Sequence, residues 1–199
     1  MSYQIINVAT AEDLELIGKF VDSVKFNTKE DHIPLHDPLF SQEGINFDIT
    51  TYGDMPREVV SIFEKYVFAI QDAVSEISGI DYGPPILGKS YIMRYVPGTE
   101  VLPGYSQDRP KNVFKSIVKW NDSHDGGIFK FKNYKIAKDL KAGDCIIFPE
   151  TEDFLREFTT VEKEPMFISD FWNAPVGESP YSGLDYKDIY WGNPLWENR

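Results

Sequence analysis

The sequence feature that most limits the possible folds of this chain is the residue pattern after Pro84. Short apolar or alternating runs succeed one another there, separated by turn residues and without a helical period between them. Phe, Tyr and the β-branched residues, which fit strands best, gather in the same part of the chain. Six strands at short spacing predict a sandwich, a barrel or a jelly roll. The predicted strands are 90–96, 113–120, 127–131, 145–148, 158–161 and 166–172.

Helices are predicted only before this region. Thr10 is a suitable N-cap for a helix at about 11–25, and a second helix with a wide apolar stripe ends at Gly79. A short strand is expected at 3–8, and the polar, turn-rich stretch 26–52 predicts a long loop with short extended pieces. We therefore expect an α+β, mainly β fold, with the N-terminal helices packed on one face of the sheet.

The chain is expected to form one domain. Its 199 residues are enough for one substantial core, and no repeat, low-complexity tract or linker divides them. The expected parts are an N-terminal strand, helices and loop in 1–83, the sheet core in 84–172, and a wrapping tail in 173–199.

The net charge and the cysteine content narrow the range of functions expected for this chain. A net charge of −12 repels phosphate backbones and anionic headgroups, so neither nucleic acid nor membrane is an expected partner. The first residues lack a basic and then apolar leader, which favours a cytoplasmic protein, or one in the host cytoplasm or virion if it is viral. Cys145, the only cysteine, lies in an apolar run and predicts a buried, inert thiol. The loop acids Glu150, Glu152 and Asp153 are interpreted as solvated surface.

Four segments after residue 90 carry a further signal. They are Tyr91–Gly98, ending in Pro-Gly; Lys119–Gly127, with Asn-Asp and Gly-Gly; Ala142–Pro149, running from Gly-Asp to Phe-Pro; and Phe167–Trp172, ending in an aromatic pair. In order and spacing they resemble the prolyl-4-hydroxylase-like branch of the 2-oxoglutarate/Fe(II) oxygenases. That resemblance implies a double-stranded β-helix, the jelly roll of this family, with a long helix behind the sheet.

The resemblance also implies a metal site, which in this family needs two histidines and one carboxylate. It places the first histidine and the carboxylate at Ser106 and Asp108, the second histidine at Arg156, and the basic residue for 2-oxoglutarate at Met166. Only Asp108 keeps its type, and arginine has no acceptor atom for a cation. We therefore expect no metal and no cofactor, but a vestigial pocket of these four residues and Tyr95, in which Asp108 and Arg156 form a salt bridge.

We expect that the three histidines do not rebuild the site elsewhere. His32 and His36 are four residues apart, but Pro34 between them opposes the helix that would bring their rings together. His124 falls in a polar turn and is interpreted as solvated.

The leading functional hypothesis is an oxygenase-fold protein without the metal triad, with a binding, structural or assembly role and a phage as one conceivable source. Aromatic residues of the tail are candidate anchors for a protein partner or a second copy, although packing onto their own domain explains them too. These residues are Tyr181, Tyr186, Tyr190, Trp191 and Trp196.

Two alternatives remain open. The first is an active hydroxylase of the prolyl-4-hydroxylase-like type, which requires Fe(II) and 2-oxoglutarate. The second is a metal-free, cupin-like binder of sugars or small molecules, with a pocket lined by Tyr95, Trp120 and Phe148.

Overall fold

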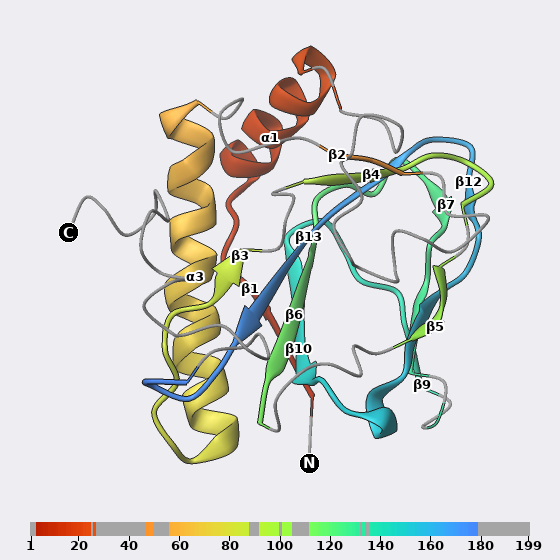
Figure 1. Cartoon of the computed structure of the whole chain (residues 1–199). Helices are drawn as coiled ribbons and strands as arrows, with labels where there is room; N and C mark the ends of the chain where they lie inside the picture. Colours follow the sequence, from red (N-terminus) through yellow and green to blue (C-terminus); the bar gives the residue numbers. More distant parts are fainter. Residues whose placement is uncertain are drawn as a thin grey trace.

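The computed structural model describes residues 3–24, 26, 47–49, 56–87, 92–99, 101–104, 112–131, 133 and 136–178. Within these residues, helices α1 (Ala11–Ser23) and α3 (Arg57–Ser78) lie beside a β-rich body (Figure 1). The strands are β1 (Gln4–Asn7), β2 (Phe47–Ile49), β3 (Ile86–Leu87), β4 (Met93–Tyr95), β5 (Val101–Gly104), β6 (Phe114–Lys119), β7 (Asp125–Gly126), β8 (Phe129–Phe131), β9 (Ile136–Lys138), β10 (Asp144–Pro149), β11 (Arg156–Phe158), β12 (Val161–Glu162) and β13 (Met166–Asn173).

Both predicted helices are confirmed, and their ends have local causes. At the start of α1, the Thr10 side chain accepts a hydrogen bond from the Asp13 amide at 3.2 Å, and the Asp13 carboxylate accepts one from the Thr10 amide at 2.9 Å. The last turn of α3 gives way to Gly79, whose φ of +73° suits glycine best. None of the described helices is long and apolar enough to cross a bilayer.

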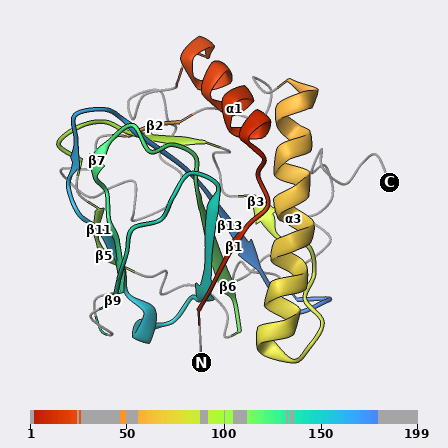
Figure 2. The same ribbon diagram turned by 180° about the vertical axis from the view of Figure 1, so that it is seen from behind.

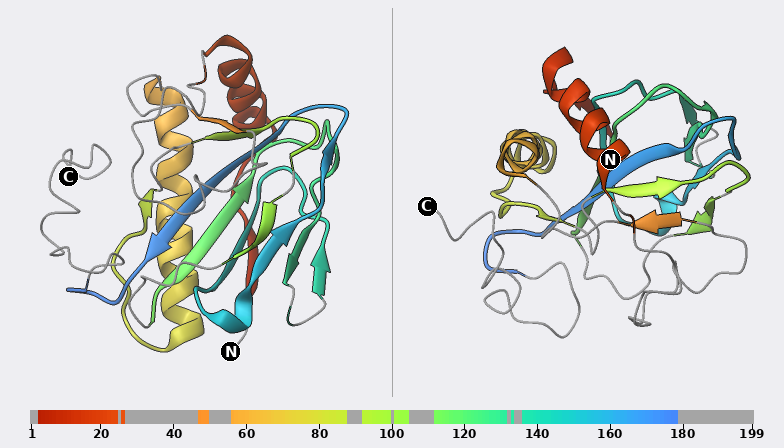
Figure 3. Two further views of the ribbon diagram at one scale, coloured as in Figure 1. Left: turned by 45° about the vertical axis from the view of Figure 1, so that its right-hand side comes forward. Right: turned by 90° about the horizontal axis from the view of Figure 1, so that it is seen from above.

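The strands form two main sheets. The larger has the order β1-β10-β6-β13-β4-β2, with β3 also paired to β13, and the smaller has the order β5-β11-β8-β9. Figure 2 shows α1 and α3 on one side of the larger sheet and the smaller sheet on the other. The view from above in Figure 3 shows the same layering. This is the predicted double-stranded β-helix, with the helices on one outer face.

Strand alternation divides the apolar residues into two cores. Phe114 and Val118 of β6 belong to the core beneath the helices, whereas Ile117 between them belongs to the core between the sheets. On β13, Phe171 faces the helices and Ile168 faces the jelly-roll interior. Odd positions of β6 and even positions of β13 therefore point into the interior.

The prediction of a strand at 158–161 is wrong in position. The structure has β11 ending at Phe158 and the separate two-residue strand β12 beginning at Val161, because β11 pairs with β8 while β12 pairs with β7 in a small sheet of its own. β5 and β9 were not predicted. Their sequences, Val-Leu-Pro-Gly and Ile-Ala-Lys, are too short to show a period.

A charged candidate site inside the jelly roll

An ion pair joins the two central strands inside the jelly roll. Lys115 and Trp172 face each other across β6 and β13, and Asp170 lies two residues before Trp172 on the same face. The Lys115 ammonium lies 3.0 Å from the Asp170 carboxylate and 4.4 Å from the centroid of the Trp172 ring. The lysine side chain is 3% exposed, so this charge is satisfied by protein groups in place of bulk water.

A second ion pair joins Glu150 and Arg156. Glu150 follows β10, and its amide donates to the Val113 carbonyl at 2.8 Å, which fixes the start of the loop. Arg156 opens β11, and its Nη1 donates to Glu150 Oε1 at 2.8 Å. The Glu150 side chain is fully buried and that of Arg156 is 6% exposed. The interpretation of Glu150 as solvated surface is wrong, because the chain turns inward there; Glu152 and Asp153 are exposed as expected.

The two pairs act on each other electrostatically. Burial lowers the pKa of Lys115, and the nearby Arg156 charge lowers it further, whereas Asp170 and Glu150 raise it. Two cations and two anions leave no net charge. Isolated ions at this depth cost several kcal/mol each, so mutual neutralisation is what permits these four side chains to be buried.

Tyr95 of β4 lies in the same interior. Burial raises the pKa of its hydroxyl, and the Asp170 charge adds to this while Arg156 opposes it. Its phenol therefore stays neutral at any physiological pH. Met166 is fully buried and is the Cα partner of Tyr95 across β4 and β13. Of the five predicted pocket residues, the structure thus brings Tyr95, Arg156 and Met166 into one interior.

The other two predicted pocket residues, Ser106 and Asp108, lie outside the described residues, and so do His32 and His36. The hypothesis of an Asp108–Arg156 salt bridge therefore stays a prediction. Among the described residues, the Arg156 guanidinium forms an ion pair with Glu150.

Two described residues lack the groups that Fe(II) and 2-oxoglutarate would need at the positions that the resemblance assigns to them. At the position that the resemblance assigns to the second histidine, Arg156 has no lone pair for a metal, and its guanidinium is bonded to Glu150. At the position assigned to the basic residue, Met166 has an uncharged thioether that cannot pair with a carboxylate. Among the described residues, no group of three or more His, Cys, Asp or Glu side chains could hold a metal ion.

The structure corrects the predictions for His124 and Trp120 and agrees with the prediction for Cys145. His124 is buried, not solvated, because its ring packs beside Gly127. Trp120 cannot line a pocket with Tyr95 and Phe148, since it packs in the core beneath the helices and they pack in the core between the sheets. Cys145 is fully buried, and burial raises the pKa of its thiol, as expected for an inert cysteine.

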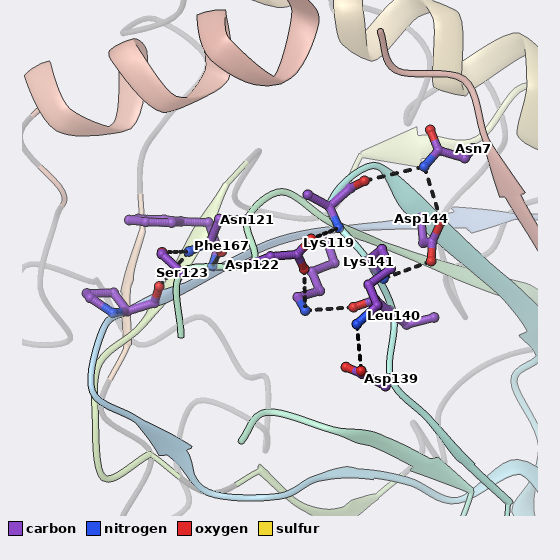
Figure 4. Close-up of polar contacts among 12 residues, drawn as sticks. Asn7, Lys119, Asn121, Asp122, Ser123, Asp139, Leu140, Lys141, Asp144 and Phe167 are labelled. Carbon is purple, nitrogen blue, oxygen red and sulfur yellow. Dashed lines mark hydrogen bonds and ion pairs between the residues drawn. The ribbon is translucent and has the colours of Figure 1, made fainter. Parts of the chain in front are cut away.

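The polar residues after β6 hold the fold together (Figure 4). Lys119 Nζ donates to the Leu140 carbonyl at 2.6 Å and lies 2.9 Å from Asp122 Oδ1. The other Asp122 oxygen accepts from the Ala142 amide at 3.0 Å. Burial raises the pKa of Asp122, but the bonds from Ala142 and Lys119 outweigh it and keep that pKa below its usual range. Asn121 donates to the Pro165 carbonyl at 2.8 Å. The family-like Asn-Asp segment therefore has a structural use.

Sequence reasoning missed Lys115, Asp170 and Trp172. The available signal was Lys115 inside the predicted strand 113–120 and Asp170 inside the predicted strand 166–172, because both strands are mainly apolar. A charge at an inward position of a buried strand needs a partner of opposite sign.

Comparison with protein-family models finds no match, and comparison with curated proteins finds none either. Solved structures, however, share the fold. The viral collagen prolyl hydroxylase of Paramecium bursaria Chlorella virus-1, in its 2OG complex, is 19% identical, with a TM-score of 0.57 over 88% of this chain and 97% of that one. A prolyl hydroxylase of Trichoplax adhaerens, bound to a hypoxia inducible factor peptide, is 14% identical, with a TM-score of 0.66 over 87% and 83%. A Pseudomonas putida prolyl-4-hydroxylase is 14% identical, with a TM-score of 0.58 over 85% and 91%. The chain thus has the fold of 2-oxoglutarate/Fe(II) oxygenases.

Proposed function

We propose that this chain is a non-catalytic protein that uses the oxygenase fold as a scaffold for a binding, structural or assembly role. One observation carries the proposal: the guanidinium of Arg156, at the position that the resemblance assigns to a metal-binding histidine, is buried and bonded to Glu150 at 2.8 Å. A permanent cation at that position repels a metal ion and offers it no electron pair.

The surroundings of Arg156 support the same conclusion. Lys115 and Asp170 add a second buried pair to the interior, so the space between the sheets holds protein charges that already satisfy one another. Met166 offers no positive charge to an oxoacid. Binding of Fe(II) and 2-oxoglutarate would require these pairs to separate, and a separated buried pair costs about 3–5 kcal/mol.

The test is an anaerobic titration of the purified protein with Fe(II) and 2-oxoglutarate, followed by visible absorption and thermal unfolding. We expect no metal-to-ligand charge-transfer band and no change in Tm. A bound ligand at 100 times its Kd stabilises a protein by about 2.7 kcal/mol. For a chain of this length that corresponds to a rise in Tm of about 5–11 °C, which the measurement resolves easily.

A matched variant assigns the result to the interior charges. Glu150→Gln together with Arg156→His removes the guanidinium and the acid that neutralises it, and leaves an imidazole at the position in question. A charge-transfer band in the native protein, together with a higher Tm, would refute the proposal and favour the hydroxylase alternative. A metal-dependent rise in Tm in the variant alone would identify the Glu150–Arg156 pair as the feature that excludes the metal.

The contact surface in this proposal is the aromatic tail, which lies outside the described residues. An assembly role predicts that the native chain self-associates and that Trp191→Ser with Trp196→Ser weakens the association. Sedimentation velocity at several protein concentrations measures both proteins. If the two proteins sediment identically at every concentration, these tryptophans are not the contact.

A further inference from the structure

His124 is a buried histidine for which the proposed function has no use. It lies in the turn between β6 and β7, and only 8% of its surface is exposed. Neither ring nitrogen has a hydrogen-bond partner among the residues that the structure describes. A buried polar group left in this state costs about 1–3 kcal/mol, so its presence calls for a physical explanation.

The ring of His124 fills the space between its turn and the start of β13. Gly127 has a φ of +61°, and a Cβ built there would lie 3.0 Å from Cε1 and 3.3 Å from Nδ1 of His124. The same Cβ would lie 2.7 Å from the sulfur of Met166. The imidazole and the thioether therefore both approach the backbone at a glycine that leaves room for them.

Strand pairing and hydrogen bonds connect the turn 121–127 to the strands around it. Gly126 pairs with Val161 where β7 meets β12, and the Phe167 amide donates to Asn121 Oδ1 at 2.9 Å. The Ile128 amide donates to Thr159 Oγ1 at 2.9 Å. Loosening of the turn would therefore open the end of the jelly roll where β12 and β13 meet.

The charges around His124 oppose a charged ring. Burial lowers the pKa of His124 below its ordinary 6.5, and the Lys119 charge on β6 lowers it further. The Asp122 carboxylate and the Asp125 and Gly126 backbones favour protonation, but Asp122 is paired with Lys119. Asp125 is paired with Lys163, which follows β12. Met166 at the start of β13, which meets the same space beside Gly127, is neutral.

We propose that His124 is an acid-sensitive latch, whose neutral ring packs turn 121–127 against the start of β13 and whose protonation releases that turn. On release the imidazole reaches water and takes up one proton. Between the ordinary pKa of 6.5 and the lowered pKa of the closed state, the opening equilibrium should therefore rise by about tenfold for each unit that the pH falls. Above this range the latch stays closed.

Amide hydrogen exchange on the full-length protein between pH 7.5 and 5.0 tests the latch. After correction for intrinsic exchange rates, protection at 121–128 and 159–167 should fall below pH 6.5 with the stated slope, while the amides of α3 keep their protection. Equal loss of protection in α3 would show global acid unfolding and overturn the proposal. Constant protection of the turn would overturn it as well.

Two further measurements test whether His124 itself causes the pH dependence. His124→Gln cannot take up the proton, so protection of its turn should not change over this pH range; a slope that persists in the variant refutes the latch. The NMR titration of the native ring does not depend on that variant folding. In protein with His32→Gln and His36→Gln, the remaining imidazole signal should titrate below pH 6.5. Titration at or above 6.5 refutes the latch.

Discussion

Replacement of Arg156 by Met tests whether the buried ion pair between Glu150 and Arg156 stabilises the fold as strongly as its geometry indicates. The Glu150 side chain is fully buried, and the variant removes the guanidinium nitrogen that lies 2.8 Å from its carboxylate. Breaking such a pair by removing one partner costs about 3–5 kcal/mol, because a charge is left in a medium that solvates it poorly. For a chain of this length the cost corresponds to a fall in Tm of about 6–20 °C.

The double variant separates the loss of pairing from the loss of packing. Glu150→Leu with Arg156→Met removes both charges and keeps apolar volume, and such replacements are often neutral or stabilising by about 1–4 kcal/mol. The double variant should therefore recover most or all of the stability that Arg156→Met loses. Glu15→Gln is the surface control, since Glu15 and Lys19 are 67% and 70% exposed, and it should leave stability unchanged.

Urea unfolding followed by far-UV circular dichroism provides the free energies of unfolding for the four proteins of the double-mutant cycle, which are the native protein, Glu150→Leu, Arg156→Met and the double variant. The reasoning predicts a coupling energy of about 3 kcal/mol or more between the two positions. If Arg156→Met costs less than about 1 kcal/mol, the pair is effectively a surface pair and the interior is wetter than described.

Other substitutions test contacts elsewhere in the fold. Tyr66→Phe removes the hydroxyl that donates to the buried Gly143 carbonyl at 2.5 Å and should cost about 1–3 kcal/mol in urea unfolding. Gly126→Ala should cost about 2–5 kcal/mol, because the new Cβ would lie 1.9 Å from the Thr160 carbonyl oxygen at a φ of +68°. Gly79→Ala, also at positive φ but in open space, should cost only about 1–2 kcal/mol in the same assay. Equal costs for the two alanines would contradict the steric argument.

The architecture could be predicted because its signals are local. The capping residues around Thr10 and the glycine after α3 mark helix ends, and the apolar runs that became β6 and β13 are bounded by turn residues. The position of β11 could not be found in this way. Apolar residues recur only at every third position in residues 155–161, which is not the period of a strand, and the pairing with β8 and β5 decides that Arg156 begins β11.

The buried ion pairs could not be predicted from the sequence for a different reason. Lys115 meets Asp170 only because β6 and β13 are neighbours in a register that sets Lys115 opposite Trp172. This register depends on the closure of the whole sheet, not on any short stretch of sequence. Glu150 shows the same limit, since its loop looks polar and exposed until the structure turns it toward Arg156.

The pairing of Glu150 with Arg156 also constrains how this chain can change over generations. An exchange of Arg156 for histidine alone would remove the guanidinium that lies 2.8 Å from the Glu150 carboxylate, and an exchange of Glu150 alone would remove that carboxylate from the guanidinium. Each single step therefore passes through a less stable protein, and natural proteins have little stability to lose. The matched pair thus resists replacement one residue at a time, and the two side chains are expected to change together or not at all.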